Sequence, residues 1–231
     1  MNNFFVRLFS GIIYVSVITG SILYSQLSFV IVCSLLFSIA IYESHLLWLK
    51  IRERESTYFS NLRWPKRFSN SYPLPQLFIL LSFFFFISIP YGGWGYNEIY
   101  NPFGVLLIFI LIWITDTMSY IIGVQFGKNK IDKKVSPNKT WEGFFGGFLF
   151  CILFSIISFN YIEEVYPVWK TISLGIFIPI FSLLGDMAQS KLKRRAEVKN
   201  SGLLIPGHGG VYDRLDSIIG VAPIAFLITI I

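Results

Sequence analysis

The strongest constraint on the fold is the length of the apolar stretches. Residues 8–42 contain no charged side chain, and shorter charge-free stretches follow at 75–91, 143–161 and 171–185. A helix that crosses a bilayer needs about 20 apolar residues. Only 14% of all residues are charged, whereas about 25% is usual. The stretches therefore predict an all-α polytopic integral membrane bundle and exclude secreted and fibrous proteins.

The stretch 8–42 is too long for one ordinary helix. We expect two helices, near 9–25 and 27–48, with a turn at Ser25-Gln26. Five more transmembrane helices give seven in total; they are expected near 75–91 (ended by Gly92-Gly93), 104–124, 143–161, 167–185 and from about Asp213 to the carboxyl terminus. No linker or internal repeat divides the chain.

Basic residues gather in the predicted polar loops. With a cytoplasmic amino terminus, 18 of the 19 Lys and Arg residues lie on one side, in Arg7 and the loops 50–67, 125–140 and 186–214. Only Lys170 lies on the other side, as the positive-inside rule predicts. The net charge of +6 thus records orientation, although basic loops also attract anionic headgroups or nucleotides.

Neither the two cysteines nor the amino terminus indicates a secreted protein. Cys33 and Cys151 stand far apart in apolar stretches, which favours buried reduced thiols over a disulfide or metal site. The apolar stretch after Arg7 is too long for a cleaved signal peptide and lacks its small-residue end.

One long polar stretch, residues 185–217, interrupts this pattern. It combines three aspartates, six cations and the glycine-rich sequence PGHGG; these charged residues are Asp186, Asp213, Asp216, Lys191, Lys193, Arg194, Arg195, Lys199 and Arg214. Carboxylates that hold Mg²⁺, cations that hold phosphates and glycines that let backbone approach a ligand are the components of phosphoryl transfer.

Each component also has a simpler explanation. Any one aspartate could be a salt-bridge partner, but Asp213 and Asp216 share a helix face, and a metal role for at least two is favoured. Lys191 and Arg195 fit a solvated cluster. His208 could be a metal ligand, a phosphate donor or a general acid. The glycines around it, at 207, 209 and 210, could form an anion-binding nest of amides.

A second polar group precedes this stretch. Asp116 lies in an apolar segment, where a carboxylate usually faces a cavity or a partner, although it could reach water or pair with a loop lysine. Thr140 and Glu142 fit the start of a helix. Ser136 and Lys139 suit a phosphate ligand at that start. The glycine pairs 123/127 and 143/147 indicate close helix packing.

These residues carry a resemblance to a known family. The segment SKLKRRAEVKNSGLLIPGHGGVYDRLD, residues 190–216, resembles the signature of the phosphatidate cytidylyltransferase (CDP-diacylglycerol synthase) family. The block from Asp116 to Gly143, with FGK and SPNKTWEG, is similar to the family's second segment. The resemblance implies one membrane-embedded domain over 1–231, with amino-terminal helices 1–100 and a catalytic half 101–231.

The resemblance also implies a reaction and its partners. The enzyme would condense CTP with phosphatidic acid, release pyrophosphate and require Mg²⁺, with a second cation left open. Its partners would be the lipid bilayer and a second copy of the chain in a homodimer, with no nucleic acid. We expect a bacterial plasma membrane, with the active site facing the cytoplasm.

The site residues follow from the pattern and the resemblance together. The expected metal ligands and catalytic carboxylates are Asp186, Asp213 and Asp216, assisted by His208, Lys193 and Arg194. The expected substrate-binding residues are Asp116, Ser136, Lys139, Ser190, Lys199, Gly209, Gly210 and Arg214.

Three positions depart from the family pattern, and two alternatives stay open. Asn200, Gln189 and Asn138 each stand where the family usually carries a charge. One alternative is a CTP-dependent transferase or kinase acting on another lipid, such as a polyprenol, for which His208 would be the base. A transporter that uses Asp116 for coupling ranks below both.

Overall fold

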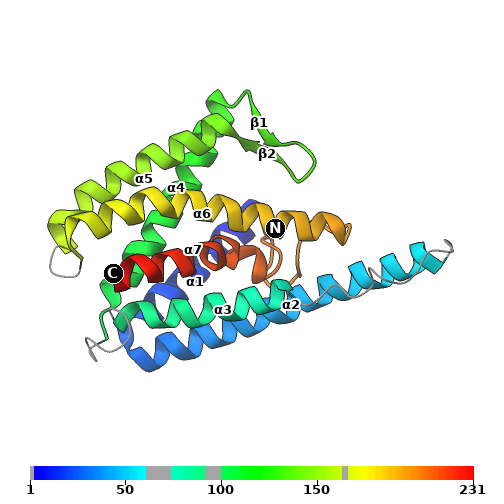
Figure 1. The fold of residues 1–231 in the computed structure, drawn as a ribbon, viewed down its shortest axis with the longest axis horizontal. Helices are drawn as coiled ribbons and strands as arrows, with labels where there is room; N and C mark the ends of the chain where they lie inside the picture. Colours follow the sequence, from blue (N-terminus) through cyan, green and yellow to red (C-terminus); the bar gives the residue numbers. More distant parts are fainter. Residues whose placement is uncertain (1–2, 61–73, 92–99, 163–165) are drawn as a thin grey trace.

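The computed structural model describes residues 3–60, 74–91, 100–162 and 166–231. This part of the chain is almost entirely helical (Figure 1). Its elements are α1 (Asn3–Tyr24), α2 (Gln26–Ser60), α3 (Leu74–Ser88), the 3-10 turn η1 (Ile89–Tyr91), α4 (Pro102–Phe126), β1 (Lys130–Asp132), β2 (Ser136–Thr140), α5 (Trp141–Ile162), α6 (Val168–Arg195) and α7 (Tyr212–Ile230). The predicted all-α architecture with seven helices is confirmed within these residues.

The predicted turn between the first two helices is confirmed. Ser25 is the residue between α1 and α2, and its Oγ accepts a hydrogen bond from the Ser28 amide at 3.1 Å. A serine at this position satisfies an amide that the first turn of a helix leaves unpaired. The turn therefore has a local cause in the sequence.

Two predicted loops are wrong in part, because helices continue into them. α2 runs to Ser60, so residues 50–60 are helical, while 61–67 lie outside the described residues. α6 runs to Arg195, so the predicted end at 185 is ten residues too early. The added segments contain no Gly or Pro, and their Lys, Arg and Glu residues favour helix. The helix ends where Glu197 takes the left-handed conformation, with φ 56°.

The predicted loop 125–140 contains a β-hairpin. β1 pairs antiparallel with β2, with Lys130 opposite Thr140. In its turn, Asp132 accepts hydrogen bonds from the amides of Val135 and Lys134 at 3.0 and 2.8 Å, and these bonds lower the pKa of Asp132. Thr140 then caps α5 as predicted, since its Oγ1 accepts from the Gly143 amide at 3.2 Å.

Glycines set the closest helix contacts. A Cβ at Gly143 would lie 2.6 Å from the Ser119 carbonyl oxygen and 3.0 Å from the Gly123 Cα, so α4 and α5 pack closely as predicted. Gly185 of α6 and Gly220 of α7 form a second such contact, in which a Cβ at 185 would lie 3.1 Å from the Gly220 Cα. These contacts bring α4 close to α5 and α6 close to α7.

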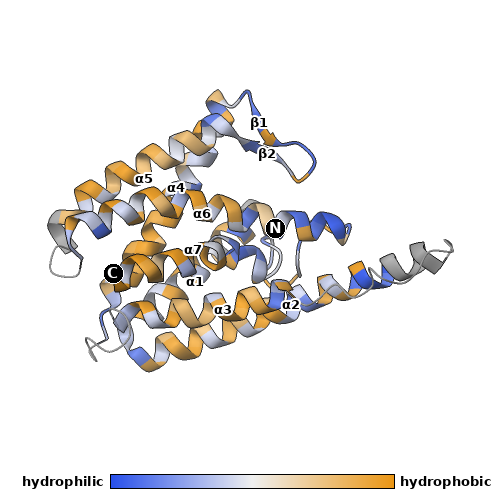
Figure 2. Ribbon diagram, viewed as in Figure 1, coloured by the Kyte–Doolittle hydropathy of each residue, from blue (hydrophilic) through white to orange (hydrophobic). Residues whose placement is uncertain are grey.

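The bundle is that of an integral membrane protein. The described residues contain six helices, α1 to α6, that are long and apolar enough to cross a membrane. Figure 2 shows the hydrophobic residues along these helices in orange. α7 carries Asp213, Arg214 and Asp216 in its first turns and packs against α2, α3, α4 and α6. Both cysteines are buried and free, as predicted.

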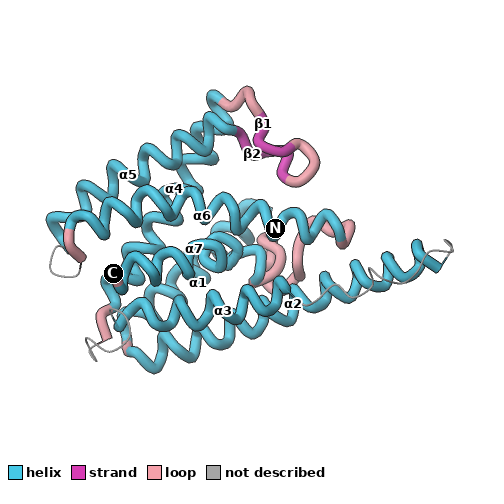
Figure 3. The backbone as a smooth tube through the Cα atoms, in the orientation of Figure 1, coloured by secondary structure: helices cyan, strands magenta, loops and turns pink. Residues whose placement is uncertain are grey.

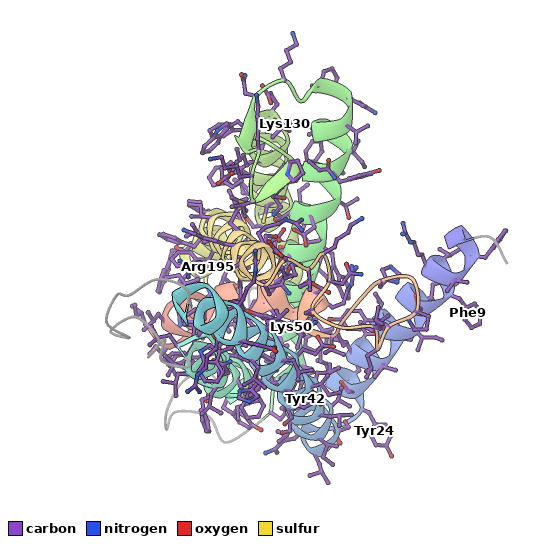
Figure 4. All side chains as sticks on the ribbon, turned by 90° about the vertical axis from the view of Figure 1, so that its right-hand side faces the viewer. Phe9, Tyr24, Tyr42, Lys50, Lys130 and Arg195 are labelled. Atoms are coloured by element: carbon purple, nitrogen blue, oxygen red, sulfur yellow. The ribbon has the colours of Figure 1, made fainter. Side chains whose placement is uncertain are left out.

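The polar ends of several elements lie on one side of the molecule. The carboxyl ends of α2 and α6 and the hairpin point to the right in Figure 1, opposite the carboxyl terminus. Figure 4 looks at the molecule from that side and labels Lys50, Lys130 and Arg195 on α2, β1 and α6. This grouping agrees with the one-sided charge pattern; which side is cytoplasmic stays a prediction.

Candidate active site

Four carboxylates from three helices line one cavity of about 740 Å³. Asp116 comes from α4, Asp186 from α6, and Asp213 and Asp216 from α7. Cations also line the cavity, from the hairpin and from α7; they are Lys130, Lys139 and Arg214. The structure therefore joins the two polar segments that the sequence places about 70 residues apart.

Asp186 links the hairpin to α6. Its carboxylate forms an ion pair with Lys139 and accepts a hydrogen bond from Ser190 Oγ at 3.1 Å. Asp186 and Ser190 are one helical turn apart, which requires α6 to continue past Gly185. Lys139, expected at a phosphate, thus also holds the hairpin beside the aspartates.

Asp213 is enclosed by hydrogen-bond donors. Lys193 Nζ lies 2.6 Å from one carboxylate oxygen, and Gln189 Nε2 lies 3.3 Å from the same oxygen. The other oxygen accepts from the amides of Ser201 at 2.8 Å and Gly210 at 3.1 Å. Only 8% of the side chain is exposed. Asp213 therefore organises the loop before α7; its predicted metal role stays a prediction.

Asp116 and Asp216 have fewer protein donors. Ser182 Oγ lies 3.5 Å from Asp116, and the Ser217 amide donates to Asp216 at 2.8 Å. Asp116 and Asp216 also interact electrostatically with Asp186. Lys139 alone forms an ion pair with this group of three in the part of the chain described.

These carboxylates fit a hard divalent cation by their chemistry. Carboxylate oxygens are the ligands that Mg²⁺ prefers, and it keeps several waters and shares substrate phosphates. A cation would also offset the repulsion among Asp116, Asp186 and Asp216. Within the described residues, no three His, Cys, Asp or Glu side chains already stand close enough to chelate an ion, so binding would need rotation of side chains.

A second cavity, of about 230 Å³, lies between α1, α4 and α7. It shares Asp116, Asp213, Arg214, Asp216 and Ser217 with the larger cavity, so the two meet at the carboxylates. Its other walls are mostly apolar and include Val15, Ile112, Trp113, Ile205 and Ile218. No motif in the sequence indicated that α1 reaches the site.

His208 faces this smaller cavity. Its Nδ1 lies 2.7 Å from Ser10 Oγ on α1. Burial, followed by the positive charges of Arg214 and Arg7, lowers the pKa of His208 below its ordinary 6.5. The imidazole is therefore neutral at pH 7 and can donate or accept a hydrogen bond there.

The loop around His208 is a tight turn (pink between α6 and α7 in Figure 3). Gly207 and Gly209 have φ of 75° and 94°, conformations that glycine adopts without strain. The Gly209 amide donates to the Ile205 carbonyl at 3.1 Å, and the Gly210 amide donates to Asp213. These two amides thus bond within the protein, and the substrate-binding role expected for Gly209 and Gly210 stays a prediction.

Other predicted site residues hold the surrounding structure. Lys193 pairs with Asp213, and Arg194 donates to the carbonyls of Val135 and Val198 at 3.3 and 3.2 Å, which joins the hairpin to the end of α6. Arg214 donates to the His208 carbonyl at 3.0 Å. Ser136, Arg194 and Lys199 line neither of the two cavities.

The position that departs from the family pattern most visibly lies beside Asp213. A Cβ built at Gly209 would lie 3.1 Å from the Asn200 Cγ and 2.8 Å from an oxygen of Asp213. Asn200 therefore packs against the glycine turn and lies beside the carboxylate of Asp213. An aspartate at this position would add a further negative charge there.

Sequence reasoning missed Glu43. This glutamate of α2 is 4% exposed, and its carboxylate accepts hydrogen bonds from Ser201, Val211 and Tyr212 at the start of α7. Its one sequence signal was its position at the end of the charge-free stretch 8–42. A carboxylate in an apolar helix needs a partner, and this holds for Glu43 as well as for Asp116.

Known proteins share much of this chain. Residues 69–231 match the model of the cytidylyltransferase family. Phosphatidate cytidylyltransferases of Staphylococcus epidermidis and Staphylococcus saprophyticus are 38% and 36% identical over 152 residues, and that of Staphylococcus aureus is 37% identical over 153 residues. The aligned region covers 64% of this chain and 58% of each relative's length.

The matches confirm the resemblance that the segment 190–216 carries. The family model includes both polar segments and, in full, the three helices that carry the four carboxylates, α4, α6 and α7; α1 and α2 lie before it. Since the model covers well over half of the sequence, the chain belongs to the cytidylyltransferase family.

Proposed function

We propose that the protein transfers the CMP moiety of CTP to phosphatidic acid, giving CDP-diacylglycerol and pyrophosphate. The observation that carries the proposal is the junction of two unlike cavities at Asp116, Asp213 and Asp216. A transfer between a polar nucleotide and a lipid needs two approaches to one reacting centre. The names of the Staphylococcus relatives support the same reaction.

The larger cavity suits the nucleotide. Its volume of about 740 Å³ lies within the range of about 300–1,000 Å³ usual for small-molecule sites. Lys130 and Lys139 line it from the hairpin, where they would bind the phosphates of CTP. The hairpin is thus the element that we assign to CTP.

The smaller cavity suits the head of the acceptor lipid. Its apolar walls would contact the glycerol and the first acyl carbons, while Arg214 and His208 would bind the phosphate. An arginine guanidinium can bind a phosphate through two parallel hydrogen bonds. The phosphate would then reach Asp216 from the side opposite CTP.

The transfer needs no strong protein base. A phosphate monoester has a second pKa near 6, so phosphatidic acid is already anionic at pH 7. One of its oxygens forms a bond to the α-phosphorus of CTP, and the bond from that phosphorus to the bridging oxygen of the β-phosphate breaks. Pyrophosphate carries away the electron pair. The protein's task is to bring two anions together in line.

Asp116, Asp186 and Asp216 would hold Mg²⁺, which when bound neutralises charge on the reacting phosphates and on the leaving group. Asp213 keeps Lys193 and the loop in place beside them. Lys139 would divide its charge between Asp186 and a phosphate. The setting that we propose is a homodimer in a bacterial plasma membrane, with the carboxylates open to the cytoplasm.

The test compares CTP labelled at the α- or the γ-phosphorus. Purified protein in mixed micelles would receive Mg²⁺ and either phosphatidic acid, diacylglycerol or a polyprenol. The proposal predicts lipid-bound α-label, no γ-label, and phosphatidic acid as the active acceptor. Transfer of γ-label would indicate a kinase instead, and labelling of the polyprenol alone would indicate another acceptor; either result would refute the proposal.

A further inference from the structure

A carboxylate from outside the family-matched segment holds the start of α7. Glu43 lies on α2, before residue 69, and is 4% exposed. One oxygen accepts from the Val211 amide at 3.2 Å, and the other accepts from the Tyr212 amide at 2.9 Å and from Ser201 Oγ at 2.7 Å. Three donors on a segment about 160 residues away thus converge on one side chain.

Glu43 supplies the cap that α7 lacks. Val211 occupies the cap position and has no side-chain hydrogen bond to offer. The first amides of a helix have no partner within the helix, and a negative charge near them is favourable. The carboxylate of Glu43 therefore fixes where α7 begins and in which direction it leaves the loop.

Two glycines of the signature segment make room for this carboxylate. A Cβ at Gly202 would lie 2.8 Å from the Glu43 Cδ, and a Cβ at Gly210 would lie 2.7 Å from it. Any larger residue at either position would displace Glu43 from the start of α7. The absence of side chains at 202 and 210 is thus explained by a residue of α2.

Glu43 and Asp213 hold the same loop from two sides. Ser201 donates its hydroxyl to Glu43 and its amide to Asp213. Gly210, whose Cα lies beside Glu43, donates its amide to Asp213. The position of Asp213, and of Asp216 one turn later, therefore depends on a residue that touches neither cavity.

We propose that Glu43 is a positioning residue for the transfer reaction, which sets Asp213 and Asp216 by anchoring the 201–212 loop and the start of α7. The kinetic part of this inference, a loss of transfer rate, rests on the proposed function. Its structural part, the anchoring, can be measured in the absence of any substrate.

The experiment compares Glu43→Gln, Glu43→Ala and Glu43→Asp with Phe37→Leu in the full chain. Phe37 is a matched control, because it is a buried residue of α2 that packs on Phe83 and Phe86 and has no polar side-chain atom with which to anchor the loop. Hydrogen exchange of peptides covering 199–213 is measured without ligands. Initial rates are then measured over ranges of CTP and Mg²⁺.

Anchoring predicts a local loss of protection. In Glu43→Gln and Glu43→Ala, exchange of the 201–212 amides should rise about tenfold, the effect of losing partners for buried donors. The turnover number should fall by at least about tenfold, and the Mg²⁺ concentration that gives half of the maximal rate should rise. The KM for CTP should change little, because the hairpin is untouched. Glu43→Asp, which keeps the charge, should recover part of the rate.

Other results would overturn the inference. Unchanged exchange over 201–212, or equal losses of turnover in Phe37→Leu and Glu43→Gln, would leave Glu43 as an ordinary buried residue. If Glu43→Ala does not insert, Ser201→Ala removes one of the three bonds and should give a smaller change in the same direction. Local loss of protection in a protein that transfers no CMP would uphold the anchoring and reject the reaction.

Discussion

The four aspartates of the larger cavity differ in their surroundings, although they share one side-chain chemistry. Asp213 accepts from four protein donors, whereas Asp216 accepts from one backbone amide in the described structure. A carboxylate enclosed by donors stabilises the fold, and one crowded by like charges is available to a cation. Stability and catalysis should therefore depend on different aspartates.

The pair of variants Asp213→Asn and Asp216→Asn tests this division. Asp213→Asn places an NH₂ group against donors and should cost about 1–3 kcal/mol of unfolding free energy. Asp216→Asn removes repulsion and should leave stability unchanged or higher, yet abolish transfer. Thermal unfolding in detergent and the CTP assay measure the two effects. Greater destabilisation by Asp216→Asn than by Asp213→Asn would contradict the assignment.

His208 should give the fold a weak pH dependence. Burial and the nearby arginines lower its pKa in the folded protein, while the unfolded chain keeps the ordinary value of 6.5. As the pH falls from 6.5 to the lowered value, the unfolded chain binds the proton first, so stability decreases over that window. Over this pH window, the melting temperature of His208→Asn should change less with pH than that of the unchanged protein. Parallel curves for the two proteins would show that another group titrates.

At the scale of elements, the site depends on how closely α6 and α7 approach. Gly185 and Gly220 face each other at the crossing, immediately before Asp186 and one turn after Asp216. Any side chain there would push the helices apart and separate the two carboxylates. The contact therefore serves the geometry of the site as well as the packing.

Gly185→Ala and Gly220→Ala test this contact, with Gly20→Ala as the control. Overpacking typically costs about 1–3 kcal/mol of unfolding free energy. Both variants should therefore melt at a lower temperature and lose most of their transfer activity. A Cβ at Gly20 would meet no atom within 4 Å, so Gly20→Ala should be neutral or stabilising by up to about 1 kcal/mol. Full activity in Gly185→Ala would show that the spacing of α6 and α7 does not control the site.

The elements also show what sequence patterns can predict. Apolar stretches located the helices, and the serines at 25 and 28 explain the turn between α1 and α2. The extensions of α2 and α6 were missed, because these helical segments are rich in charged residues and carry no long apolar stretch. The hairpin was missed because β2 contains Pro137 and few strand-forming residues.

The site was predictable in part for similar reasons. The resemblance located Asp116, Asp186, Asp213 and Asp216, and the cavity brings these four together. Glu43 and Ser10 were missed, since their partners lie 158 or more residues away and no local spacing connects them. Contacts between distant segments become visible only in the folded chain.

At the scale of the whole molecule, the two ends of the bundle should lie on opposite sides of a membrane. The hairpin and the turn after α1 lie at opposite ends of the molecule (Figure 1). Six candidate spans connect them. The charge pattern predicts that the hairpin faces the cytoplasm.

Single cysteines can test this orientation, because Cys33 and Cys151 are buried and should not react. Tyr24 is 86% exposed, and Lys134 is exposed in the hairpin turn. A reagent that cannot cross the membrane should label Tyr24→Cys in intact cells and Lys134→Cys only in opened ones. The reverse pattern would place the active site outside the cytoplasm.

The most direct test of the proposed reaction is transfer of α-labelled CMP from CTP to phosphatidic acid, with the unchanged protein and Asp216→Asn measured side by side over a Mg²⁺ titration. We expect labelled CDP-diacylglycerol only when phosphatidic acid and Mg²⁺ are both present, and none with Asp216→Asn, which should insert and melt normally. Undiminished transfer by Asp216→Asn would contradict the assignment of the reaction to the carboxylates where the two cavities meet.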